Sequence, residues 1–184
     1  MRKKKGKTGM RKSVLFEILD WSRVILMALT IAFIANRTLI ANAQIPTGSM
    51  ENTIMTESRV IINRLAYVKE DPKRGDIISF YFPDDGKTLF IKRIIGLPGE
   101  IVRGKDGNVY IDGIRLEEGY LKEEMEGSFG PFVVPEDAFF VMGDNRNNSL
   151  DSRYWEDSFV EKDEIIGRAE FVYYPEVKSL RQPE

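Results

Sequence analysis

An apolar stretch near the N-terminus constrains this chain more than any other feature. It runs from Val24 to Ile34 without a charge, and Trp21 to Ala41 is about the length that a hydrocarbon core requires. Residues 1–12 carry seven Lys and Arg residues and no acid. This arrangement predicts three parts: a basic cytoplasmic tail over residues 1–20, a transmembrane anchor over 21–41 and an extracytoplasmic domain over 42–184.

A cleavable secretory signal is the alternative interpretation of the same segment. A basic start, an apolar stretch and the tripeptide Ala41-Asn42-Ala43 also resemble an export signal that is cut after Ala43. Both interpretations place the remainder of the chain outside the cytoplasm.

The composition of the remainder excludes several classes of function. After residue 12 there are 20 basic and 29 acidic residues, a net charge of −9, which argues against nucleic acid as a partner. The chain contains no histidine and no cysteine. A Ser-His-Asp triad, a thiol protease, a zinc site built on these residues and a disulfide framework are therefore excluded, and we expect no metal and no cofactor.

From Arg59 onwards the pattern is mostly β. Short β-branched and aromatic runs alternate with Gly, Pro and Asp, and Asp112-Gly113 is a two-residue hairpin signal. The fold class expected is mainly β, with a compact and largely antiparallel domain behind the N-terminal helix. The predicted strands are Val60–Asn63, Asp76–Phe82, Thr88–Ile95, Ala138–Met142 and Glu164–Tyr174, with a hairpin around Asp112-Gly113.

Two residues in separate segments are candidates for catalysis. Ser49 lies in a Thr-Gly-Ser turn, which by itself is typical of an ordinary surface loop. Lys92 interrupts an apolar run and, in a strand, faces the same side as Phe90 and Ile94. Burial there disfavours the charged amine, so that Lys92 can accept a proton and activate a serine hydroxyl.

A dense polar loop, residues 143–155, follows the run Ala138–Met142. The opening Asp-x-Asn-x-Asn is a poor match to a calcium loop because Arg146 supplies no ligand, so we expect a hydrogen-bonded support in which Asp151 pairs with Arg153 or Arg146. The acidic, glycine-punctuated residues 117–130 are interpreted as a solvated surface loop.

Three stretches together resemble the type I signal peptidases, serine proteases with a Ser-Lys dyad. They are I-P-T-G-S-M, F-I-K-R-I-I-G-L-P-G-E and M-G-D-N-R-N-N-S-L-D-S-R-Y-W, in that order behind one apolar segment. The similarity runs from about Trp21 to Tyr174 and is closest to the short, single-anchor form typical of Gram-positive bacteria. It implies an enzyme of the cell membrane that removes signal peptides from exported preproteins after Ala-x-Ala, with lipid as its second partner.

The resemblance also implies a role for each matching position. Ser49 corresponds to the nucleophile, Lys92 to the general base and Thr47 to an oxyanion-hole hydroxyl. Ser149 corresponds to the serine that orients the lysine amine. Asp151 and Arg153 correspond to a supporting ion pair, and the positions that form two shallow substrate pockets are Ala43, Ile45, Ile54, Val60, Phe90 and Ile91.

Two other functions are compatible with parts of this pattern. A self-cleaving regulator of the repressor type uses related Ser-Lys chemistry, but this chain has no basic recognition helix. A non-catalytic, membrane-anchored β module would make Ser49 a loop residue and Lys92 a satisfied strand lysine. Turnover of a labelled precursor in trans is expected only of the peptidase.

Overall fold

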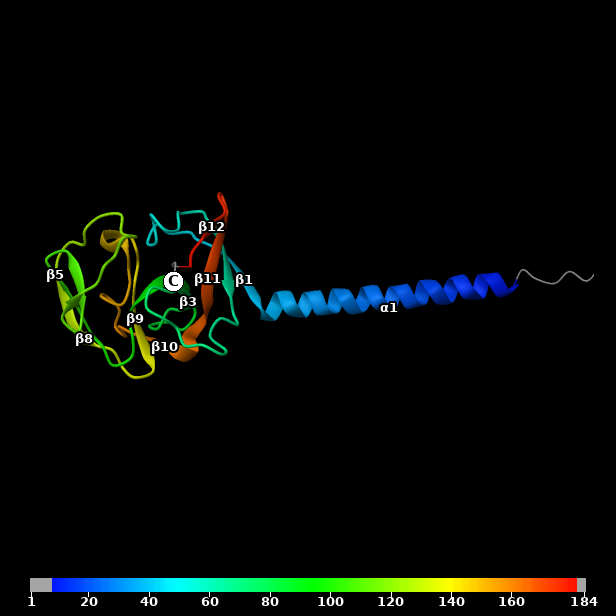
Figure 1. The fold of residues 1–184 in the computed structure, drawn as a ribbon, viewed down its shortest axis with the longest axis horizontal. Coiled ribbons are helices and arrows are strands. Elements are labelled where there is room, and N and C mark those ends of the chain that lie inside the picture. The colour runs from blue at the N-terminus through cyan, green and yellow to red at the C-terminus, as the bar shows by residue number, and fades with distance from the viewer. Residues whose placement is uncertain (1–7, 182–184) are drawn as a thin grey trace, which may run out of the picture. The chain divides into compact units, whose positions relative to one another are not determined.

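The chain divides into two units, residues 1–39 and residues 40–184. The computed structural model describes residues 8–181, so part of the expected basic tail lies outside the described residues. The first unit contains the helix α1, Thr8–Thr38 (Figure 1). The strands are β1 Ile40–Gln44, β2 Arg59–Asn63, β3 Ile77–Tyr81, β4 Leu89–Gly96, β5 Ile101–Lys105, β6 Asn108–Ile111, β7 Ile114–Arg115, β8 Phe129–Val133, β9 Ala138–Met142, β10 Val160–Glu161, β11 Ile165–Tyr174 and β12 Lys178–Ser179.

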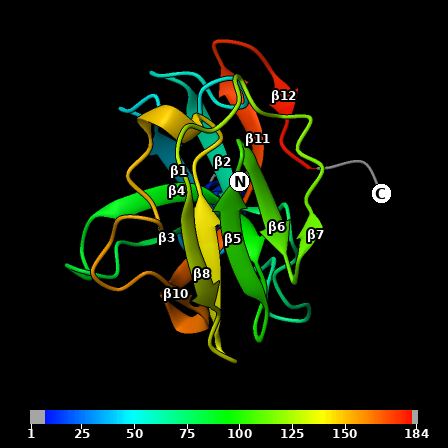
Figure 2. The same ribbon diagram turned by 90° about the vertical axis from the view of Figure 1, so that its left-hand side faces the viewer.

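The second unit is built from two antiparallel sheets. The larger has the strand order β1-β2-β11-β3-β4-β9-β10, with β12 paired to β11, and the smaller has the order β7-β6-β5-β8. Figure 2 shows the smaller sheet facing the viewer, and in Figure 1 its strands β5 and β8 lie at the end of the unit away from β1 and β11. The expectation of a mainly antiparallel β domain is confirmed.

Both faces of the larger sheet are buried in its middle. Alternate residues of β3 point to opposite sides, so Ile77 joins one apolar cluster while Ile78 and Phe80 join another. This explains why β3 reads as a continuous apolar run instead of an alternating one. A third cluster, which includes Val102, Val109 and Phe140, joins the smaller sheet to the larger.

The end of the apolar segment is a strand. The predicted anchor extends to Ala41, but α1 ends at Thr38 and β1 pairs with β2, with Ala43 opposite Val60. Ala41 and Ala43 pack against the core while their neighbours are exposed, which is the two-residue period of a half-buried strand. Among the residues that the structure describes, none of the helices combines the length and apolar character needed to cross a membrane.

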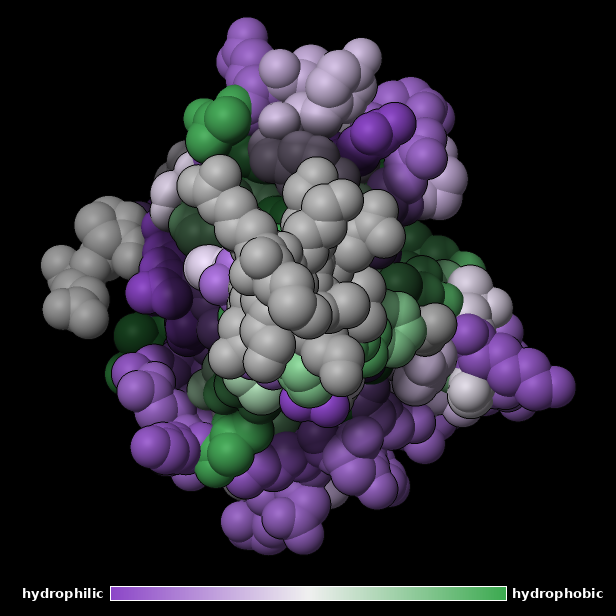
Figure 3. Space-filling view, turned by 90° about the vertical axis from the view of Figure 1, so that its right-hand side faces the viewer, coloured by the Kyte–Doolittle hydropathy of each residue, from purple (hydrophilic) through white to green (hydrophobic). Residues whose placement is uncertain are grey.

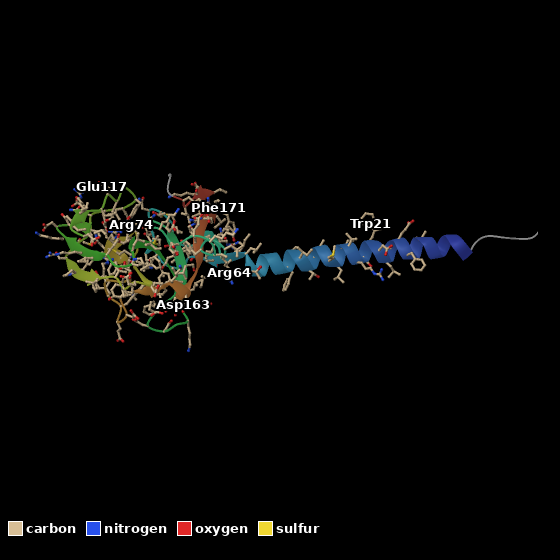
Figure 4. The ribbon with its side chains drawn as sticks, turned by 60° about the horizontal axis from the view of Figure 1, so that its bottom comes forward. Trp21, Arg64, Arg74, Glu117, Asp163 and Phe171 are labelled. Carbon is tan, nitrogen blue, oxygen red and sulfur yellow. The ribbon has the colours of Figure 1, made fainter. Side chains whose placement is uncertain are left out.

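The described side chains of α1 are exposed within its unit, as Trp21 illustrates in Figure 4. The large apolar side chains that the structure describes between Val14 and Phe33 are 45–68% exposed. In Figure 3 the rim of the visible face is mostly hydrophilic, with apolar patches inside it. A contiguous row of exposed apolar side chains generally marks a surface that another apolar phase covers.

Candidate active site

The turn that carries Ser49 is anchored to the core by the apolar side chains of its own residues. Met50 and Ile54 are completely buried in the core, and the Ile54 N–H donates to the Met50 carbonyl over 2.8 Å. The Asn145 N–H donates to the Ser49 carbonyl over 3.1 Å, and the Asn145 side chain donates to the Gly48 carbonyl over 3.0 Å. The backbone around Ser49 is therefore held by both the core and the polar loop 143–155.

The structure brings Ser49 and Lys92 together. The Lys92 Nζ donates to Ser49 Oγ over 2.8 Å and to the Ile91 carbonyl over 3.2 Å. Lys92 is 4% exposed, and its Nζ lies 5.1 Å from the centre of the Phe90 ring. Lys92 and Phe90 are two residues apart in β4, so their side chains lie on the same face of the strand. In this setting the lysine amine contacts a hydroxyl but little water.

Burial is the main influence on the pKa of the Lys92 amine. It lowers the pKa of Lys92 from 10.5 to about 8, because desolvation disfavours the charged form. The charges of Asp151 and Asp144 act in the opposite direction and raise the pKa, while Arg153 lowers it. A substantial share of neutral amine is therefore present at mildly alkaline pH.

The polar loop 143–155 contains the expected support pair. Arg153 Nε donates to Asp151 Oδ1 over 2.7 Å, and the other oxygen of Asp151 accepts the Gly143 N–H over 2.9 Å. Of the two predicted partners for Asp151, the structure selects Arg153. Arg146 instead pairs with Glu118, with distances of 2.9 and 2.5 Å between guanidinium and carboxylate.

Ser149 does not make the hydrogen bond that its predicted role requires. Its Oγ is buried and has no hydrogen-bond partner among the described residues, whereas the Lys92 amine contacts Ser49 and Ile91. In this structure the amine is oriented by Ser49, the Ile91 carbonyl and the walls of the site.

A cavity of about 450 Å³ opens beside the dyad. Of the six predicted pocket residues, four line it: Ala43, Ile45, Phe90 and Ile91. Thr47, the predicted oxyanion-hole residue, also lines it. Ile54 and Val60 do not line it; both are fully buried in the core cluster that also contains Ile45 and Ile91, and their contact with substrate stays a prediction.

Sequence reasoning also missed the buried ion pair that Arg93 forms with Asp144. Arg93 follows Lys92 in β4 and donates to Asp144 over 2.8 and 2.6 Å, with both side chains nearly inaccessible. The guanidinium also lies 3.9 Å from the centre of the Tyr120 ring. A second charge inside an apolar strand was the available signal, but the identity of its partner depends on the fold.

The interpretation of residues 117–130 as a solvated loop is wrong for its first residues. Glu118 accepts from the buried Arg146, the Tyr120 hydroxyl donates to Glu118 over 2.6 Å, and Asn52 Nδ2 donates to the Tyr120 carbonyl over 2.9 Å. This segment thus connects the turn after Ser49 to the loop 143–155. Among the described residues no group of His, Cys, Asp or Glu is arranged to hold a metal ion.

Comparison with known proteins identifies the family of this chain. The family model described as signal peptidase, peptidase S26, matches residues 18–174. The chain belongs to the peptidase S26 family of signal peptidases. It is accordingly a serine endopeptidase, and Ser49 and Lys92 lie within the part of the chain that the family model matches.

Several relatives share the family. A protein named probable signal peptidase I-2 from Synechocystis sp. is 42% identical over 85% of this chain and 73% of its own length. Signal peptidase I P from Bacillus subtilis subsp. natto is 40% identical over 86% of this chain and 90% of its own length. A solved signal peptidase I from Enterococcus faecalis is 38% identical, with a TM-score of 0.48, and the match covers 54% of this chain and 97% of that one.

Proposed function

We propose that this S26 peptidase removes signal peptides from exported preproteins, with Ser49 as the nucleophile and neutral Lys92 as the general base. The observation that carries the proposal is the 2.8 Å contact between Lys92 Nζ and Ser49 Oγ inside a site where the lysine pKa falls to about 8. A hydroxyl beside a neutral amine can lose its proton as it attacks a carbonyl.

The reaction follows from these two groups. Ser49 Oγ forms a bond to the carbonyl carbon of the scissile peptide, and its proton moves to Lys92 Nζ. The C–N bond then breaks, the new amine leaves with the proton from Lys92, and an ester on Ser49 remains. Water attacks the ester while Lys92 takes a proton from it, which releases the carboxylate and restores both side chains.

Thr47 is proposed to stabilise the tetrahedral intermediate. It lines the cavity two residues before Ser49, so its hydroxyl and the Ser49 N–H can donate to the same oxyanion. Loss of one such donor typically lowers the rate about a hundredfold or more.

The shape of the cavity supports a preference for small side chains. Ala43 and Ile45 on one wall and Phe90 and Ile91 on another are apolar, and an extended peptide presents every second side chain to one wall. We propose that the last and the third residue before the cut enter this cavity, which accounts for Ala-x-Ala selectivity.

The exposed apolar side chains of α1 support membrane association. They lie behind the basic residues 1–12, which favour the cytoplasmic side of a bilayer. We propose that α1 holds the enzyme at the membrane with its peptidase unit on the outer side, where precursors emerge.

Cleavage of a labelled Ala-x-Ala precursor by purified protein in detergent tests the assignment. Ser49→Ala and Lys92→Met should each lower turnover by a factor of 1,000 or more, about the loss seen when a catalytic group is removed. Lys87→Met, an exposed lysine just before β4, is the matched control and should retain activity. Full activity of either site variant would contradict the dyad.

A further inference from the structure

The C-terminal segment 178–181 packs against the turn 48–54, which carries the proposed nucleophile. Its strand β12 pairs with β11, and this pairing fixes the segment on the larger sheet. Leu180 is 6% exposed and lies in the same apolar core cluster as Met50 and Ile54 of the turn. Two segments that are far apart in the sequence are therefore joined through one part of the core.

Lys178 supplies hydrogen bonds that the end of this turn does not make by itself. The carbonyls of residues 48–50 accept from N–H groups of the turn or from Asn145. The carbonyls of Asn52 and Thr53 accept, among the described residues, only from Lys178 Nζ, over 3.3 and 3.1 Å. Carbonyls at the end of a helical turn lack partners within it, and a lysine side chain is a common donor to them.

The backbone of the turn bends at Asn52, where φ is 80°. A residue other than glycine keeps such a conformation when its surroundings hold it there. The Asn52 side chain donates to the Tyr120 carbonyl over 2.9 Å, and the Asn52 carbonyl accepts from Lys178. Lys178 therefore provides one of two restraints on a bent residue that lies three positions after Ser49.

Lys178 does not contribute directly to the chemistry of the site. Neither Lys178 nor the two residues that it contacts in the turn line the cavity beside the dyad. It is also absent from the charged groups that act on the pKa of Lys92. Any effect of Lys178 on catalysis would therefore pass through the position of Ser49.

We propose that Lys178 is a positioning residue, which holds the end of the turn 48–54 and so keeps Ser49 Oγ at hydrogen-bond distance from Lys92 Nζ. The inference rests on the proposed function, in which Ser49 attacks the scissile carbonyl. Reacting groups must be placed closely, and a displacement of about 1 Å can lower a rate about a hundredfold. A contact outside the cavity can thus control the rate without touching the substrate.

Steady-state kinetics of the full-length protein in detergent, with the labelled Ala-x-Ala precursor, test this role. Lys178→Met keeps the apolar stem and removes the ammonium group. Its kcat should fall about tenfold, the loss expected for one hydrogen bond of typical strength. Its KM should change less than about twofold, because the cavity is untouched. Lys178→Arg keeps the donors and should recover most of the rate, and the midpoint of the pH profile should equal that of wild type in both variants.

Lys105→Met is the matched control, because Lys105 is an exposed lysine on β5 of the smaller sheet. Its kinetics should equal those of wild type. Backbone amide hydrogen exchange adds a measurement that does not depend on catalysis. In Lys178→Met the amides of the turn 48–54 that donate to the Met50 carbonyl should exchange about tenfold faster than in wild type, again the effect of one hydrogen bond. In Lys105→Met they should exchange at the wild-type rate.

Three results would overturn the inference. An unchanged kcat in Lys178→Met would show that the contact serves at most stability, which the midpoint of urea unfolding measures. Unchanged amide exchange in the turn would show that Lys178 does not hold it. An equal loss of kcat in Lys178→Arg and Lys178→Met would show that hydrogen bonding by residue 178 is not the cause. If wild type fails to cleave the precursor, the proposed function is refuted, and the exchange measurement still decides whether Lys178 holds the turn.

Discussion

The pH dependence of cleavage follows from the depressed pKa of Lys92. With a pKa of about 8, the neutral fraction of the amine is about 1% at pH 6, about half at pH 8 and about 90% at pH 9. If neutral Lys92 is the base, kcat/KM should rise about fiftyfold from pH 6 to pH 8. It should then gain less than about twofold from pH 8 to pH 9, because most of the amine is already neutral.

The change in kcat/KM between pH 8 and pH 9 distinguishes a base with a lowered pKa from a lysine with its ordinary pKa. An amine with its usual pKa of about 10.5 would still give roughly a tenfold gain between pH 8 and pH 9. The assay is initial-rate cleavage of an uncharged fluorogenic peptide under kcat/KM conditions in detergent, with tryptophan fluorescence to confirm that the protein stays folded. A tenfold rise above pH 8, or a flat profile down to pH 5, would refute the assignment of Lys92 as a buried neutral base.

The same shift has a measurable effect on stability. The folded-state pKa lies below the unfolded value, so the unfolded chain binds more protons between pH 8 and pH 10.5, and Lys92 becomes less destabilising as pH rises through that window. Below pH 8 Lys92 lowers the free energy of unfolding by its full amount, about 3 kcal/mol for a pKa shift of this size. Lys92→Met should therefore be inactive yet at least as stable as wild type at pH 7, and its advantage in urea unfolding should shrink towards pH 10.

Three further changes test the support around the dyad. Glu118→Gln should lower the free energy of unfolding by about 3 kcal/mol, because it leaves a buried arginine without its charged partner, whereas the exposed neighbour Glu117→Gln should have little effect in the same urea titration. Gly143→Ala should reduce kcat about a hundredfold, since its added Cβ would lie inside contact distance of the Ser49 carbonyl and would displace the nucleophile; an unchanged kcat would show that the turn can absorb the shift. The negative charge of Asp151 raises the Lys92 pKa in wild type, so Asp151→Asn should lower this pKa and move the midpoint of the pH profile to lower pH. A shift of the midpoint to higher pH would contradict the sign of that interaction.

Local patterns in the sequence predicted the middle of the fold well. The strand Ala138–Met142 matches its predicted bounds, and Asp112 and Gly113 both have positive φ, as the expected tight hairpin turn requires. Strand β1 was missed because its apolar residues follow directly on an apolar helix. The two-residue alternation of Ala41 and Ala43 was its only distinguishing signal.

Two strands of the smaller sheet were missed for a different reason. β8 contains Gly130 and Pro131, and β5 contains Gly104 between two basic residues, so neither has the composition of a strand. Their pairing with each other supplies the order that their sequences do not indicate. The contact of Glu118 with Arg146 was beyond prediction for a related reason, since it joins segments 28 residues apart.

The alternation of β4 assigns different roles to two adjacent cations. Arg93 faces Asp144 and forms a buried ion pair, while Lys92 on the opposite face contacts a hydroxyl and a carbonyl. Asp144 and Asp151 are the carboxylates that raise the Lys92 pKa, and each is already bound by an arginine. Arg153 lowers the Lys92 pKa and so offsets part of the effect of these carboxylates, and desolvation remains the dominant influence on the pKa of Lys92. The ion pair of Arg153 with Asp151 is therefore part of what keeps the lysine neutral enough to act as a base.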